Sequence, residues 1–120
     1  MTTLRITTSA GEVVREPDRA ALAAAIEAAG RPGPGAFVIL DVEADQGAGP
    51  ERDAPFLQAV RLPGTAWQVE VWRAAAERYR AVVADAAAVT RVFWSWAEGT
   101  GDWQRLRWQQ VGGRPVAAAG

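Results

Sequence analysis

Apolar and polar side chains alternate along several short stretches of the chain, which is the two-residue period of a half-buried strand. Residues 4–8 (Leu-Arg-Ile-Thr-Thr) alternate in this way, and the turn-forming sequence Ser-Ala-Gly-Glu leads into a short run at 13–15. Residues 56–62 and 67–72 form a second alternating pair, joined by Pro-Gly-Thr-Ala. We therefore predict two β-hairpins, one from each pair of runs.

A helical period replaces the alternation after Pro17. Asp18 is suited to the positive end of a helix. The apolar residues that share one side of this helix are Ala21, Leu22, Ala25, Ile26 and Ala29. Gly30 follows directly and is expected to end the helix, so we predict it over about residues 18–29.

Three further segments are assigned to a strand, a loop and an extended piece. Residues 37–40 (Phe-Val-Ile-Leu) form a short apolar run of strand formers bounded by turn residues, which predicts a central strand. Residues 44–53 combine glycine, proline and charge without an apolar period, which is typical of a surface loop. Trp103 and Trp108 are expected on a last extended piece near the C-terminus.

The stretch over residues 71–97 allows two interpretations, because it contains neither glycine nor proline and is rich in alanine. One interpretation is a single long helix. The other is a strand around Tyr79, followed by a separate helix that begins near Asp85 and ends at Gly99.

The composition excludes several classes of chemistry. Without histidine, cysteine or lysine, the chain cannot build a Ser-His-Asp or Cys-His site or a P-loop, and a metal would need carboxylate ligands alone. Asp41, Glu43 and Asp45 stand at alternate positions after the predicted central strand, and Glu70 could face them as an acid/base partner. Exposed carboxylates at strand ends are common, so we predict no catalytic site, no metal site and no cofactor.

Charge is distributed unevenly along the chain. Residues 1–53 carry nine acids against five arginines, and residues 54–120 carry five acids against eight arginines. The acids concentrate in one segment, at Asp41, Glu43, Asp45, Glu51 and Asp53. We predict that this segment attracts a basic partner; the alternative is a solvated loop that keeps the protein in solution. A net charge of -1 and the lack of lysine argue against direct binding of nucleic acid.

All six tryptophans lie between residues 67 and 108. The residues at helical spacing that predict a core are Val89, Val92, Phe93 and Trp96. Trp94 lies about 160° around the same helix from Trp96, and Trp72 faces away from Trp67 if that segment is a strand. Tryptophan is enriched at binding hot spots, so we predict that Trp72 and Trp94 anchor a partner.

The length and the termini suggest one domain. With 120 residues a single core is expected, over residues 1–111, followed by a flexible tail over 112–120. No run approaches the roughly eighteen apolar residues of a membrane span, and the N-terminus lacks the pattern of a signal peptide. We therefore expect a cytoplasmic protein without membrane contact.

From about residue 37 to residue 111 the chain resembles small actinobacterial immunity proteins of polymorphic-toxin systems. The motifs that carry the resemblance are an apolar strand ending in acids, Phe56-Leu57-Gln58-Ala59, Val69-Glu70, Tyr79-Arg80-Ala81, the aromatic helix Val92-Phe93-Trp94-Ser95-Trp96-Ala97-Glu98-Gly99, and the closing Trp103 and Trp108. The resemblance implies a strand followed by a helix within residues 71–97. It also implies that the protein neutralises a cognate toxin, often a nuclease or a deaminase acting on nucleic acid, by covering its active site.

Together these observations predict an α+β domain, in which an antiparallel sheet of about five or six strands is packed on one face by helices near 18–29 and 85–98. The expected function is immunity: stoichiometric, non-enzymatic inhibition of a basic toxin, with the acidic segment speeding association. The alternative is a non-catalytic adaptor or a homodimerising scaffold that uses the same aromatic surface symmetrically.

Overall fold

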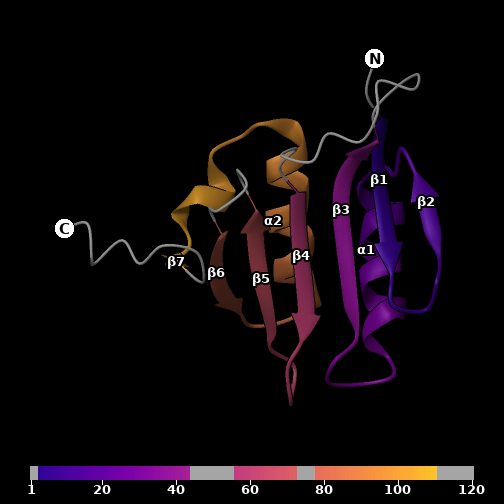
Figure 1. Cartoon of the computed structure of the whole chain (residues 1–120), viewed down its shortest axis with the longest axis horizontal. Helices are drawn as coiled ribbons and strands as arrows, with labels where there is room; N and C mark the ends of the chain where they lie inside the picture. Colours follow the sequence, from indigo (N-terminus) through magenta and orange to yellow (C-terminus); the bar gives the residue numbers. More distant parts are fainter. Residues whose placement is uncertain (1–2, 44–55, 73–77, 111–120) are drawn as a thin grey trace.

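The structure, a computed structural model, describes residues 3–43, 56–72 and 78–110. Within these residues, seven strands form one antiparallel sheet and two helices pack on one of its faces (Figure 1). The elements in chain order are β1 (Thr3–Thr8), β2 (Val13–Arg15), α1 (Arg19–Gly30), β3 (Phe37–Glu43), β4 (Phe56–Arg61), β5 (Trp67–Trp72), β6 (Arg78–Val83), α2 (Ala86–Glu98), the 3-10 helix η1 (Asp102–Arg105) and β7 (Gln109–Gln110). The α+β architecture is confirmed, and the described part of the chain carries seven strands rather than five or six.

The strand order β2-β1-β3-β4-β5-β6-β7 places β1 between two strands that follow it in the chain. Arg5 of β1 lies opposite Arg15 of β2 on one side and opposite Asp41 of β3 on the other. The chain therefore crosses over β1 through α1, whereas the strands from β3 to β6 are neighbours in sequence order. Both predicted hairpins are present, as β1–β2 and β4–β5.

The first helix begins where the sequence pattern indicates. Asp18 is its N-cap, and the Oδ1 atom accepts a hydrogen bond from the backbone N–H of Ala21 at 2.7 Å. This bond satisfies one of the donors that the first turn of a helix leaves without a partner. The residues that α1 buries are Leu22, Ala25, Ile26, Ala29 and Gly30.

Gly30 has a different role from the one that the sequence suggests. It is the last residue of α1 rather than a residue that stops the helix, and Arg31 follows as a C-cap in right-handed helical conformation. A Cβ atom at Gly30 would lie 2.7 Å from Cζ2 of the buried Trp67, so the glycine leaves room for this indole ring. The Arg61 guanidinium also donates a hydrogen bond to the Gly30 carbonyl and thereby ties the helix end to β4.

The stretch over residues 71–97 is divided, because β6 and α2 are separate elements. Asp85 caps α2 by accepting a hydrogen bond from the Ala88 N–H at 2.9 Å. Gly99 ends it at a φ of 75°, a left-handed conformation that glycine adopts without a steric cost. The single long helix is therefore excluded, and the predicted strand followed by a helix is confirmed.

The segment after α2 differs from the extended piece that the sequence predicts. Trp103 lies in η1, where its backbone N–H donates to Ser95 Oγ at 3.0 Å. The Trp108 indole then donates from Nε1 to the Trp103 carbonyl at 2.9 Å, and the two rings meet edge to face at 6.1 Å. These side-chain contacts hold the segment against α2 and leave only the short β7 as strand.

The core lies between the sheet and the two helices. Alternate residues of the strands point into it, and the largest side chains that are fully buried there are Phe93, Ile6, Leu22, Ile26, Leu40 and Leu57. Val89, Val92 and Phe93 are buried as predicted, whereas Trp96 is partly buried against this core. Neither α1 nor α2 is long and apolar enough to cross a membrane, a finding that covers the described residues alone.

Candidate partner-binding surface

The face of the sheet opposite α1 and α2 is the surface that carries Trp72, and we call it the helix-free face. Strand alternation creates it: β5 buries Trp67, Val69 and Val71 toward the helices and turns Gln68, Glu70 and Trp72 to the other side. The two large apolar side chains that are most exposed, Val13 at 50% and Val82 at 63%, occupy this face near opposite edges of the sheet.

One row of residues crosses the helix-free face from β2 to β6. The pairs Arg15–Arg5, Arg5–Asp41, Phe56–Trp72 and Trp72–Arg78 are each in direct cross-strand register. Asp41 follows Leu40 in β3, and Phe56 precedes Leu57 in β4. Because Leu40 and Leu57 are paired, Asp41 and Phe56 are the next neighbours across these two strands and join β3 to β4 within the row. The row therefore has an ionic half on β2, β1 and β3, and an aromatic half on β4, β5 and β6.

The aromatic half is a stack of three side chains, Phe56, Trp72 and Arg78, which we call the Trp72 stack. The Phe56 and Trp72 rings are nearly parallel, 12° apart, with centroids separated by 5.3 Å. The Arg78 guanidinium carbon lies 4.8 Å from the Trp72 centroid on the far side. Such aromatic and cation–π pairs each contribute about 0.5–1.5 kcal/mol, which helps to hold the indole in place.

Two polar atoms within the Trp72 stack have no hydrogen-bond partner among the residues that the structure describes. They are the indole Nε1 of Trp72 and the Nε of Arg78, and both are buried. A buried donor without an acceptor is costly, by about 1–3 kcal/mol. An acceptor oxygen supplied by a partner, after a small rotation of these side chains, would remove this cost.

Asp41 does not present a free negative charge on this face. Its carboxylate accepts two hydrogen bonds from Arg5, from Nη2 at 2.7 Å and from Nε at 3.1 Å, in the forked geometry that arginine favours. The two side chains are 28% and 31% exposed, so the pair is partly screened by water. The proposed electrostatic role of Asp41 in attracting a basic partner is therefore weakened by this neutralisation.

The remaining acids of the predicted site lie at or beyond the border of the described residues. Glu43 is the last residue of β3, where its backbone is paired with Thr3. Asp45, Glu51 and Asp53 lie outside the described residues. Glu43 and Phe56 border residues 44–55, which lie outside the described residues. Both border residues lie at the same end of the sheet as Trp72.

Of the carboxylates considered for catalysis, Asp41 and Glu70 have described side chains, and these two do not form a joint site. Asp41 and Glu70 share the helix-free face but stand on β3 and β5, about 10 Å apart across the sheet and about 7 Å apart along the strands. Asp41 binds Arg5, and Glu70 accepts a weak hydrogen bond from the Gln68 side chain at 3.4 Å. Among the described residues, no group of three or more acidic side chains is arranged to hold a metal ion.

Tyr79 and its arginine neighbours are also divided by the sheet. Tyr79 lines a hollow on the helix side together with Val71, Trp103 and Trp108. Arg78 lies on the helix-free face with Trp72, because adjacent residues of a strand point to opposite sides. These side chains therefore do not form a shared platform on which nucleic-acid bases could stack.

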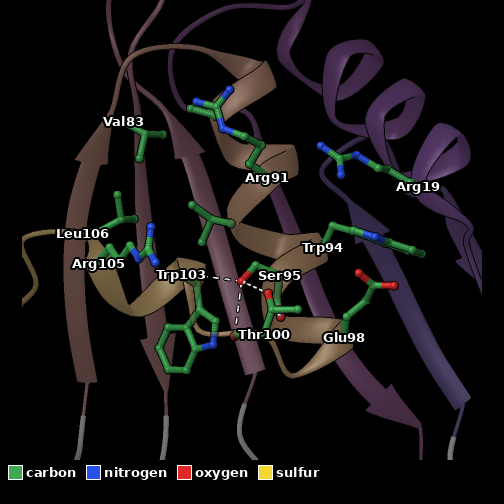
Figure 2. A pocket seen from close by; sticks show the side chains of 12 residues that line it. Arg19, Val83, Arg91, Trp94, Ser95, Glu98, Thr100, Trp103, Arg105 and Leu106 are labelled. Atoms are coloured by element: carbon green, nitrogen blue, oxygen red, sulfur yellow. Dashed lines mark hydrogen bonds between the residues drawn. The ribbon is translucent and has the colours of Figure 1, made fainter.

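Trp94, the second predicted anchor, lies on the other side of the molecule from Trp72. It projects from α2 and is partly buried against the core. Its ring lines a groove of about 410 Å³ that also includes Arg19, Arg91 and Glu98 (Figure 2). The sheet thus separates the two tryptophans, and a flat partner surface cannot cover both.

Comparison of the chain with family models, with curated proteins and with solved structures returns no match.

Proposed function

We propose that the protein is an immunity protein, which binds a cognate protein toxin through the helix-free face and blocks it without catalysis. The observation that carries this proposal is the Trp72 stack: a large aromatic side chain, ordered by Phe56 and Arg78, on a sheet face that neither helix covers. Tryptophan and arginine dominate hot spots in protein interfaces. The stack supplies both residue types at one place.

The surroundings of the stack suit a protein partner better than a small ligand. The helix-free face is a broad sheet surface with half-buried side chains, and the Arg5–Asp41 pair lies in the same row. A central apolar anchor with polar groups around it is the usual arrangement of a recognition patch. A partner that covers the row would exclude water from the anchor and strengthen its contribution.

The charge of residues 44–55 indicates which kind of toxin the protein would bind. The sequence between Glu43 and Phe56 contains three acids and one arginine, and it borders the end of the sheet that carries Trp72. An acidic segment beside the anchor would speed the approach of a basic toxin, such as a nuclease or a nucleic-acid deaminase. The resemblance to actinobacterial immunity proteins supports the same class of partner.

A pull-down with the product of the neighbouring gene tests the proposal, because immunity genes are expected beside their toxin genes. The two proteins should co-purify and form a complex whose dissociation constant is measurable by calorimetry. Trp72→Ala should weaken the complex by about 30-fold, equivalent to about 2 kcal/mol, because it removes the anchor.

Trp94→Ala is the matched control, since it removes another half-buried tryptophan from the opposite side of the molecule. It should leave the affinity nearly unchanged once circular dichroism has shown that both variants are folded. Loss of affinity in Trp94→Ala alone would refute the proposed surface. A neighbouring gene product that does not bind, together with symmetric dimers in light scattering that Trp72→Ala dissociates, would instead favour the homodimerising scaffold.

A further inference from the structure

The groove beside Trp94 has the size and position of a small-molecule site. It lies over α2, between the start of α1 and η1, and has a volume of about 410 Å³, within the usual range for ligand pockets (Figure 2). Its walls combine Arg19 of α1 with side chains of β6, α2 and η1, which are far from α1 in the sequence. It is separated from the Trp72 stack by the sheet, so it is independent of the surface proposed for the toxin.

Positive charge is concentrated in this groove, although the whole chain carries a net charge of -1. Three arginines line it, Arg19 from α1, Arg91 from α2 and Arg105 from η1, and the carboxylate among the lining residues is that of Glu98. Arg19 and Arg91 together carry two positive charges at one side of the groove. A dianion would neutralise this charge, whereas a single carboxylate would leave half of it.

Two of these arginines, Arg19 and Arg91, are exposed and have no protein partner within residues 3–43, 56–72 and 78–110. Neither Arg19 nor Arg91 forms an ion pair or a side-chain hydrogen bond with the described residues. Arg19 is moreover the first residue of α1, where the helix dipole is positive and a cation is unfavourable. A bound anion between the two helices would offset both the dipole and the repulsion between the guanidinium groups.

The rest of the lining provides hydrogen-bonding groups and an aromatic wall. Ser95 Oγ lies 2.7 Å from Thr100 Oγ1 and accepts a hydrogen bond from the Trp103 N–H, so the hydroxyl groups are held in place (Figure 2). The partly buried Trp94 lies beside Arg19 and Glu98 in the same view. We propose that this groove binds a small molecule through a dianionic phosphate group, held by Arg19 and Arg91, with its organic part against Trp94.

The test follows the indole N–H signals of the protein by NMR while inorganic phosphate is added. The Trp94 signal, identified by its loss in Trp94→Phe, should shift and saturate with a dissociation constant of about 1 mM or less. Acetate should bind at least about 10-fold more weakly, because it brings one negative charge rather than two to the pair of guanidinium groups. Binding should also weaken as the pH falls through the second pKa of inorganic phosphate, because the ion then loses its second negative charge.

Arg19→Gln and Arg91→Gln should each weaken phosphate binding by about 10-fold, while Arg107→Gln, an exposed arginine outside the groove, should not. The proposal is overturned if phosphate produces no saturable shift of the Trp94 signal. It is equally overturned if Arg107→Gln lowers the affinity as much as the groove variants, because binding would then follow only the general charge. Neither result depends on the toxin, so this test is separate from that of the proposed function.

Discussion

The two faces of the sheet use the same alternating strands for different purposes. On the helix-covered face, Ile6, Leu57 and Val69 are completely buried and pack with Phe93 in a continuous core. On the helix-free face, the side chains are half-buried or exposed, and some of them interact through a stack and an ion pair. The comparison teaches that the stability of this fold is concentrated on one side, which leaves the other side available for recognition.

The largest expected difference in the free energy of unfolding is between substitutions at Phe93 and at Val82. Phe93→Ala would open a cavity in the middle of the core, because its side chain has no exposed surface. We expect a loss of about 3–5 kcal/mol in the free energy of unfolding, measured by urea denaturation. Val82→Ala, at a position that is 63% exposed on the helix-free face, should change it by less than about 0.5 kcal/mol. Similar losses in the two variants would contradict the contrast between the faces.

Gly30→Ala tests how closely the helix-covered face is packed, because it adds a single methyl group there. The new Cβ would approach Trp67 Cζ2 to 2.7 Å, so the indole or the helix end must move. Overpacking of this kind is expected to cost about 1–3 kcal/mol in thermal or urea denaturation. Gly101→Ala is the control, because the nearest atom to its Cβ lies at 3.9 Å. An unchanged stability in Gly30→Ala would show that Trp67 does not determine the residue at this position.

The smallest effect is expected for the ion pair on the helix-free face. Asp41→Asn removes the charge that Arg5 binds but keeps the size of the side chain. Because both groups are about one-third exposed, the free energy of unfolding should fall by less than about 1 kcal/mol. A loss several times larger in urea denaturation would mean that this face contributes to stability as much as the core does.

The sequence predicts the local elements of this fold because their signals are local. Asp85 and Gly99 border α2 with side-chain and backbone properties that suit helix ends. The alternation of residues 67–72 likewise predicts that Trp72 faces away from Trp67, as the structure shows. These features depend on neighbours within a few residues, and so they can be inferred without the rest of the chain.

The features that sequence analysis missed depend on residues that meet from distant parts of the chain. The space at Gly30 is defined by Trp67, and the Trp72 stack requires the register of β4, β5 and β6. The groove lined by Arg19 and Arg91 exists only because α1 packs beside α2. A periodic pattern indicates which side of an element is apolar, but it does not specify which side chains lie opposite.

Site-directed thiol labelling tests the central claim, that the helix-free face binds the partner, most directly. The chain contains no cysteine, so a single substitution introduces a unique reactive group. Gln58→Cys places it on the helix-free face, one row from the Trp72 stack, and Ala87→Cys places it on the exposed side of α2. Adding the co-purified toxin should slow the labelling of Gln58→Cys several-fold and leave that of Ala87→Cys unchanged. Protection of Ala87→Cys with free labelling of Gln58→Cys would contradict the account, because the partner would then occupy the helix layer.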